Sequence, residues 1–149
     1  MNATRGGARW AAVVLALAVG AVACGGGTSG GGSTGGGGGS GEMIRLSDGQ
    51  EAANHGTGRV SGTTAEVELG DFYFAPTILE GPAGAEVTLT LRNAGQALHN
   101  FEIPDQDVDV DVQPGQEATV TVTFPSSGAV TFECKYHVAQ GMRGELRAL

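Results

Sequence analysis

Hydrophobic and polar positions alternate with a period of two along the last ninety residues of the chain. The alternation is clear in residues 65–69 (AEVEL), 86–91 (EVTLTL) and 117–124 (EATVTVTF). One face of these runs is apolar and consists of Ala65, Val67, Leu69, Val87, Leu89, Leu91, Val120, Val122 and Phe124. This period is typical of β-strands with one buried face. Residues 99–103 (HNFEI) and 129–134 (AVTFEC) are two further candidate strands.

Turn-forming residues separate these runs. EGPAG at 80–84, QPGQ at 113–116 and PSSG at 125–128 combine proline and glycine in short polar segments. No stretch of this region shows a convincing helical period. Short strands at this spacing predict an all-β fold, either a sandwich or a barrel with mostly antiparallel strands.

The first 23 residues have a different pattern. Arg5 and Arg9 precede an apolar run, residues 10–23, which is shorter than the ~20 residues that span a bilayer. We expect residues 1–23 to be a secretory signal peptide. Cys24 follows small residues, which resembles a bacterial lipobox, and the resemblance implies lipid modification of Cys24. A cleaved soluble protein and an uncleaved anchor are the alternatives.

A glycine-rich segment follows Cys24. Twelve of the 18 residues from 24 to 41 are glycine, and such a chain behaves as a flexible coil. We assign residues 24–58 to a flexible linker and residues 59–149 to a single domain. His55 lies in the linker, where we expect it to be solvated and not to bind a metal.

The domain is acidic. From residue 61 onwards, 13 acidic side chains stand against four basic ones, which leaves −9 before histidine is counted. Nucleic acid is therefore excluded as a partner, because binding it requires a basic surface. A protein partner with a basic docking surface fits the charge.

Residues 104–112 (PDQDVDVDV) alternate between acidic and valine side chains. A calcium loop fails in detail, because Val112 stands where such a loop needs glycine and Ala118 where it needs glutamate. We expect Asp107, Asp109 and Asp111 to share one face of an edge strand, where like charges oppose edge-to-edge pairing. A docking stripe for a basic partner is the alternative.

Candidate metal chemistry lies near the end of the chain, in CKYHVAQGM at 134–142. Each residue type has an ordinary structural explanation, since a lone cysteine, histidine or methionine usually belongs to a core. Together, Cys134, His137 and Met142 give the spacing C-x2-H-x4-M, and His99 offers a second imidazole. Two imidazoles, a thiolate and a weak axial thioether are the donors of a blue-copper electron-transfer site.

The domain resembles the cupredoxin family, and its ligand loop has the plastocyanin and pseudoazurin length. TFECKYHVAQGMRG, the His99–Asn100 pair and DFYFAPTILEGPAGAEVTLTLRN carry the resemblance, which covers nearly all of residues 61–149. It implies a Greek-key β-sandwich of about eight strands. It also implies one copper ion, alternating between Cu(I) and Cu(II), with His99, Cys134, His137 and Met142 as ligands.

Two positions depart from the family pattern. Tyr136 stands where plastocyanins usually have proline, and Lys135 stands where many members have serine or threonine bonded to the asparagine beside the first histidine. We therefore expect Asn100 to lack its usual side-chain partner. Such outer contacts tune a metal site, so the departures bear on the redox potential.

The function that the resemblance implies is single-electron transfer between extracytoplasmic redox partners by a monomer tethered to the membrane. The electron would pass through His137 and an apolar patch to which Val138, Ala139 and Pro104 contribute. No catalysis is expected, because no nucleophile–base pair and no open metal position are evident.

Three alternatives to electron transfer stay open. One is a lipoprotein for copper storage or delivery. The second is a structural zinc domain that uses Cys134 and both histidines. The third is an enzyme with an open red-type copper site, for which Glu102 and Glu133 are the nearby carboxylates.

Overall fold

Twelve strands form between residues 41 and 149, the part of the chain that the structure, a computed structural model, describes. The strands are β1 (Met43–Arg45), β2 (Glu51–Ala53), β3 (Thr57–Arg59), β4 (Thr64–Gly70), β5 (Tyr73–Ala75), β6 (Ile78–Gly81), β7 (Glu86–Asn93), β8 (His99–Ile103), β9 (Val108–Val112), β10 (Glu117–Thr123), β11 (Ala129–Glu133) and β12 (Arg143–Ala148). Two short 3-10 helices, η1 (Pro104–Gln106) and η2 (Val138–Gln140), interrupt them. The prediction of an all-β fold is confirmed.

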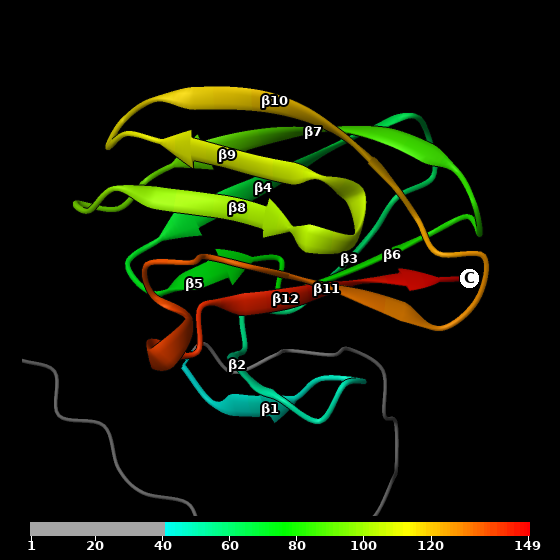
Figure 1. Ribbon diagram of the computed structural model, residues 1–149, viewed down its shortest axis with the longest axis horizontal. Helices are drawn as coiled ribbons and strands as arrows, with labels where there is room; N and C mark the ends of the chain where they lie inside the picture. The colour runs from blue at the N-terminus through cyan, green and yellow to red at the C-terminus, as the bar shows by residue number, and fades with distance from the viewer. Residues whose placement is uncertain (1–40) are drawn as a thin grey trace, which may run out of the picture. The chain divides into compact units, whose positions relative to one another are not determined.

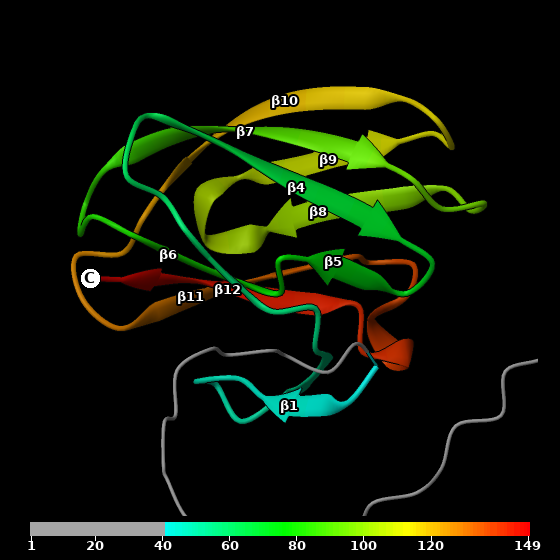
Figure 2. The same ribbon diagram turned by 180° about the vertical axis from the view of Figure 1, so that it is seen from behind.

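The strands form two larger sheets and a separate hairpin (Figures 1 and 2). One sheet has the order β10-β7-β4-β5, and the other has the order β3-β6-β12-β11-β8-β9. β4 runs parallel to β7, and β6 runs parallel to both β3 and β12, whereas the remaining pairs are antiparallel. The hairpin β1–β2 lies outside the two sheets, beside β12.

The core lies between the two sheets, where the apolar faces predicted from the alternation meet. In β7, the buried side chains of Val87, Leu89 and Leu91 alternate with more exposed ones. Three phenylalanine rings join the sheets, since Phe74 of β5 packs edge-on against Phe101 of β8 and Phe132 of β11, at centroid distances of 5.8 and 5.1 Å. The core therefore fixes the ends of β8 and β11 relative to each other.

The predicted linker 24–58 extends too far. Residues 24–40 lie outside the described part, but residues 41–58 contain β1, β2 and most of β3 and pack on the domain. Leu46 is only 3% exposed, and the backbone N–H of Ser47 donates to the buried Glu145 carboxylate of β12 at 2.9 Å. These strands could not be recognised from the sequence, because the segment is polar and its strands are too short to show an alternation.

The acidic segment forms an edge strand, as predicted. β9 ends the six-stranded sheet, with Val108 and Val112 buried and Asp109 and Asp111 exposed. Asp107 does not share their face, because it ends η1 in a left-handed conformation (φ 53°) before the strand begins.

Candidate metal centre

Three of the four predicted ligands stand at an end of a strand, and the fourth, His137, lies in the loop between β11 and β12. His99 opens β8, Cys134 directly follows β11, His137 precedes η2, and Met142 directly precedes β12. His99, Cys134 and Met142 are fully buried, whereas His137 is half-buried. Pairing of β11 with β12 therefore closes the 134–142 loop, and pairing of β8 with β11 brings the loop to His99.

Backbone hydrogen bonds fix the loop. The Cys134 N–H donates to the Met142 carbonyl at 3.0 Å, and the His137 N–H donates to the Cys134 carbonyl at 2.9 Å. The Met142 N–H in turn donates to the His137 carbonyl at 3.3 Å. A turn at Gly141 (φ 83°) completes the loop, in the left-handed region that favours glycine. These hydrogen bonds hold the three candidate ligands of the loop in fixed positions relative to one another.

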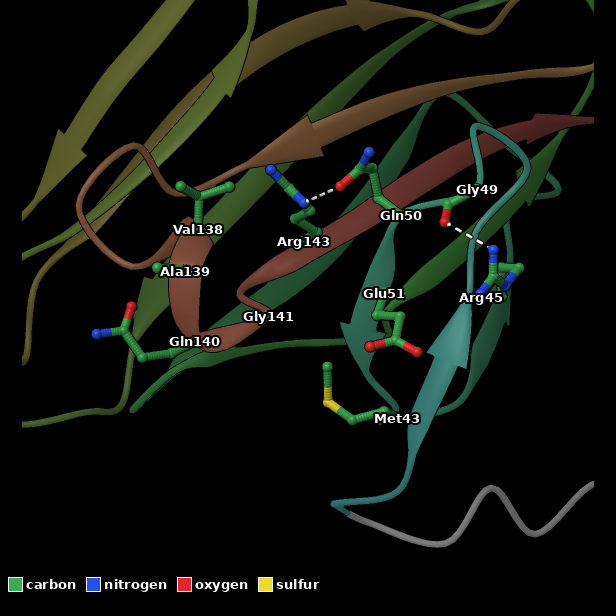
Figure 3. Close-up of a pocket in the computed structure, with 10 residues that line it drawn as sticks. All are labelled: Met43, Arg45, Gly49, Gln50, Glu51, Val138, Ala139, Gln140, Gly141 and Arg143. Atoms are coloured by element: carbon green, nitrogen blue, oxygen red, sulfur yellow. Dashed lines mark hydrogen bonds between the residues drawn. The ribbon is translucent and has the colours of Figure 1, made fainter.

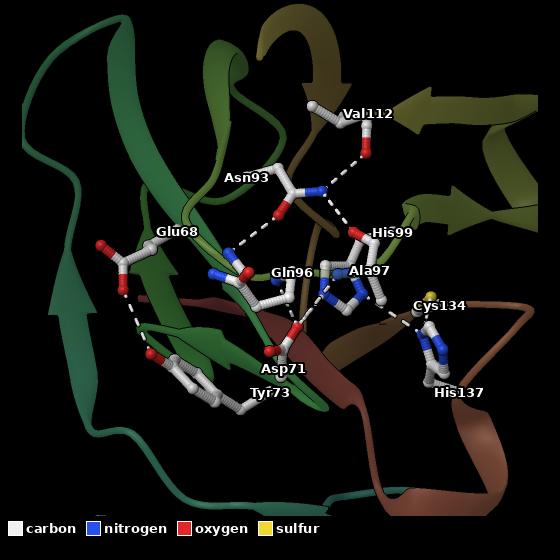
Figure 4. A network of polar contacts seen from close by, with 11 residues as sticks. Glu68, Asp71, Tyr73, Asn93, Gln96, Ala97, His99, Val112, Cys134 and His137 are labelled. Carbon is white, nitrogen blue, oxygen red and sulfur yellow. Dashed lines mark hydrogen bonds and ion pairs between the residues drawn. The ribbon is translucent and has the colours of Figure 1, made fainter. Parts of the chain in front are cut away.

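Three donor atoms converge on one point (Figure 4). His99 Nδ1 lies 3.2 Å from His137 Nδ1, and Cys134 Sγ lies 3.4 Å from His137 Nδ1. Within residues 41–149, these three form the only group of three or more histidine, cysteine or acidic side chains whose ligand atoms all lie within 4.8 Å of one another.

The arrangement fits a soft metal ion. Metal–nitrogen bonds of about 2.0 Å and metal–sulfur bonds of about 2.3 Å are long enough for one ion to bridge the two ring nitrogens, and to bridge Cys134 Sγ and His137 Nδ1. Burial excludes water from His99 and Cys134, and Met142 sits in the same core cluster as Cys134. Thiolate and thioether favour Cu(I), and imidazole suits several transition metals.

A carboxylate that the sequence analysis missed holds the first histidine. Asp71, in the turn between β4 and β5, accepts a hydrogen bond from His99 Nε2 at 3.2 Å (Figure 4). Hydrogen bonds from the Gln96 and Ala97 backbone N–H groups, the former foremost, hold the pKa of Asp71 below its usual value. Burial lowers the pKa of His99, although Asp71 opposes this shift.

No sequence signal pointed to Asp71. The residue lies 28 positions before His99, in a turn that joins two strands of the other sheet, and an aspartate in a turn is ordinary. Only the packing of the two sheets reveals the pair.

A second polar network holds the other side of the loop, and it supplies Asn100 with partners other than the usual serine or threonine. The side-chain N–H groups of Asn100 donate to Asp109 at 2.7 Å and to Asp111 at 2.8 Å. The backbone N–H of Lys135 donates to the side-chain oxygen of Asn100 at 3.5 Å. Lys135 Nζ donates to Asp109 at 2.6 Å, and the Tyr136 hydroxyl donates to Asp111 at 2.9 Å. Asn100 is therefore fully partnered, by the acidic edge strand and not by a serine or threonine.

This network changes the electrostatics of the edge strand. Lys135, followed by Asn100, lowers the pKa of Asp109, and Asn100, followed by Tyr136, lowers the pKa of Asp111. Asp109 correspondingly raises the pKa of Lys135. Both carboxylates are occupied with the loop, which weakens the case for a docking stripe at this point.

The surface around His137 is aromatic. The Phe72 ring lies edge-on to His137 at 4.9 Å between centroids, and Tyr136 lies at 6.4 Å. Phe72 is 42% exposed and Tyr136 is 45% exposed. Pro104 does not contribute to this surface, because it follows β8 at the far end from His99, and the five-residue strand spans roughly 13 Å.

The hairpin β1–β2 supports the loop from below (Figure 3). The Ala53 N–H donates to the Gly141 carbonyl at 3.0 Å, and Met43 lies beside Gly141. Val138 and Ala139 line the open depression between the hairpin and the loop, where Ala139 is exposed and Val138 is half-buried. Residues predicted to be linker thus contact the candidate ligand loop.

His55 is placed as a structural residue. Its ring stacks on Tyr73 at 3.6 Å between centroids, and its backbone N–H donates to the Thr77 hydroxyl. It is only partly exposed, so the expectation of a freely solvated side chain is wrong. It belongs to no group of potential metal ligands in residues 41–149.

Comparison with known proteins gives a consistent family. The model of the cupredoxin-like domain matches residues 49–147. Cytochrome c oxidase subunit 2 of Thermus thermophilus is 29% identical over 70 residues, which cover 47% of this chain and 51% of that protein. The copper-resistant cuproprotein CopI of Pseudomonas aeruginosa is 42% identical over 48 residues, 32% of this chain and 26% of that protein. The chain thus matches about half or less of the length of these relatives.

Among solved structures, reduced auracyanin from Roseiflexus castenholzii superposes with a TM-score of 0.50 at 22% identity. The superposition covers 60% of this chain and 99% of auracyanin. At this identity the likeness establishes the fold alone.

Proposed function

Because this chain belongs to the cupredoxin-like domain family, we propose that it is a membrane-tethered type 1 copper protein that carries single electrons between extracytoplasmic partners. Copper is the cofactor of the family. The observation that supports the proposal most strongly is the convergence of Cys134 Sγ with the Nδ1 atoms of His99 and His137. The buried Met142 is hydrogen-bonded to Cys134 through its backbone carbonyl.

The roles of the four side chains follow from their donors. His99, His137 and Cys134 would hold the ion, with Met142 as a weaker fourth ligand. When bound, copper supplies a one-electron couple between Cu(I) and Cu(II). The backbone hydrogen bonds of the loop hold the ligands in place. The ligands would therefore move little when the oxidation state of the ion changes.

His137 is the proposed route to the surface. It is the only one of the four ligands that is not fully buried, and the exposed rings of Phe72 and Tyr136 flank it. With four side chains on the ion and no carboxylate among them, we propose an electron carrier and not an enzyme.

The setting of the domain is part of the proposal. The predicted signal 1–23, lipid-modified Cys24 and the glycine-rich segment up to residue 40 lie outside the described residues. Between residues 41 and 149, no helix is long and apolar enough to cross a membrane. The net charge of −8 favours redox partners with a basic surface.

Copper storage or delivery is the second candidate. The similarity to a copper-resistant cuproprotein over 48 residues favours it, and the thiolate and thioether would also retain Cu(I).

The test is the visible absorption of the purified protein after loading with Cu(II), beside Met142→Ala and a matched Met43→Ala control. Met43 is 46% exposed and is not one of the four proposed ligands, so its loss should leave the donor set unchanged. We expect an intense blue band that changes in Met142→Ala alone, together with a reversible one-electron potential. A pale protein that still binds copper would exclude the electron carrier and leave storage or delivery.

A further inference from the structure

The Asp71 carboxylate is not one of the four proposed ligands, but it contacts one of them, His99. Its Oδ1 atom accepts from His99 Nε2, the ring nitrogen opposite the one that faces Cys134 and His137 (Figure 4). A donor at Nε2 leaves Nδ1 as the unprotonated nitrogen. The contact therefore selects the tautomer that a metal ion at the convergence point requires.

Asp71 is itself held in place. The same Oδ1 atom accepts from the Gln96 N–H at 2.8 Å and from the Ala97 N–H at 3.3 Å. Gly95 makes the approach possible, because a Cβ there would contact Asp71 Oδ1 and lie 2.8 Å from His99 Nε2. Asn93 orders the same turn by accepting from the Gly95 N–H at 2.9 Å and donating to the Ala97 carbonyl at 2.9 Å. The carboxylate is a built partner of the ring and not a chance surface contact.

From this geometry we propose that Asp71 is a positioning residue, which fixes the orientation and tautomer of His99 and strengthens the binding of Cu(II) relative to Cu(I). The inference rests on the proposed copper site. A carboxylate bonded to a ligand imidazole increases the basicity of that ligand, and a more basic, more negative surrounding favours the higher oxidation state. The Asp71 side chain is 40% exposed, so solvent screens its charge and the hydrogen bond contributes most of the effect.

The test compares Asp71→Ala and Asp71→Asn with Asp105→Asn in the purified protein. Asp105 is exposed on η1, beyond the far end of β8, so its replacement changes the net charge equally without touching the site. Asn keeps an oxygen that can accept from His99 Nε2 and serves as the variant that retains the fold if Asp71→Ala does not. Cu(II) and Cu(I) affinities are measured by competition titration, the potential by voltammetry, and the His99 tautomer by ¹⁵N NMR of the metal-free protein.

We expect Asp71→Ala to bind Cu(II) at least tenfold more weakly, within the 10- to 100-fold range of such outer contacts, with a smaller loss for Cu(I). Each tenfold difference between the two losses raises the potential by about 59 mV. Asp71→Asn should follow in the same direction with a smaller change, and only Asp71→Ala, which has no acceptor for His99 Nε2, should alter the His99 tautomer.

Two outcomes would overturn the inference in distinguishable ways. If the unaltered protein gives the blue band and both Asp71 variants match Asp105→Asn in affinity, potential and tautomer, the role of Asp71 is wrong and the copper site stands. If the unaltered protein does not bind copper, the proposed function fails and the role of Asp71 fails with it.

Discussion

The two histidines of the candidate centre are held by different kinds of structure. His99 is fully buried at the start of β8, and a carboxylate from the opposite sheet fixes its ring. His137 is half-buried in the 134–142 loop, whose position depends on its own backbone hydrogen bonds and on two neighbours, the edge strand β9 and the hairpin β1–β2. The sandwich thus supplies one rigid donor, and a supported loop supplies the others.

This difference suggests a division of labour. The His99 side is closed to solvent and suits a donor whose geometry must not change. The loop side reaches the surface beside Phe72, and it suits contact with a partner. Changes on the two sides should therefore differ in whether they affect metal affinity or the stability of the fold.

The largest effect should follow from removing the loop's thiolate. Cys134→Ser replaces the only thiol within residues 41–149 by a hydroxyl, which is a poor donor for copper. We expect complete loss of the blue band and a loss of Cu(I) affinity larger than for any change at Asp71. Visible absorption and competition titration measure both, and far-UV circular dichroism verifies the fold. A blue band that persists in Cys134→Ser would mean that the 134–142 loop does not supply the thiolate ligand.

A smaller but general effect should follow from weakening the hairpin below the loop. Leu46 is 3% exposed, and Leu→Ala substitutions at buried sites cost about 2–5 kcal/mol. We expect Leu46→Ala to cost about 2 kcal/mol of unfolding free energy, near the lower limit, because the hairpin lies outside the main core. Urea denaturation measures the change.

Met43→Ala is the matched control on the same hairpin, since its side chain is largely exposed and its loss should cost much less. If Leu46→Ala and the unaltered protein are equally stable, residues 41–58 do not contribute to the stability of the domain and belong to the linker as predicted.

Substitutions at two glycines test the His99 side and the loop side of the centre separately. In Gly95→Ala the new Cβ meets Asp71 and the His99 ring, so the strand side must shift. In Gly141→Ala the new Cβ meets the movable end of Met43, and the φ of 83° imposes a backbone strain of about 1–3 kcal/mol.

We therefore expect Gly95→Ala to lower metal affinity by about tenfold, as loss of an outer contact does. Gly141→Ala should mainly lower the melting temperature. Metal titration and thermal unfolding of both variants measure the contrast, and the reverse pattern would contradict the division between the two sides.

Much of the fold could be predicted because burial of one strand face leaves a period of two in the sequence. β4, β7 and β10 follow the alternating runs closely, and β8 and β11 follow the other two candidate strands. β1, β2 and β3 could not be predicted, since strands of three residues are too short for a period and lie beside a glycine-rich segment.

The candidate site divides in the same way. Cys134, His137 and Met142 are close in sequence, so their spacing indicated three donors, and His99 on a separate candidate strand offered the second imidazole. Asp71 depends on the packing of one sheet on the other, and the pairing of Lys135 with Asp109 depends on the register that sets Asn100 opposite Asp111. Contacts of this kind leave no local signal.

The smallest predicted effect concerns acid stability on the loop side. The pKa of Asp109 is lowered in the folded protein, chiefly by Lys135, so the folded state binds fewer protons than the unfolded state as the pH falls towards 4. Its contribution to stability is therefore present above the unfolded-state pKa of 3.8 and is lost as the pH falls through the folded pKa.

Lys135→Met should flatten this acid dependence of the unfolding free energy, because the main cause of the shift disappears. Arg92→Met removes the same charge from the other sheet as a control, and denaturation curves from pH 5 to about pH 2 compare the two. Equal flattening in both variants would mean that overall charge, and not the contact with β9, stabilises the loop in acid.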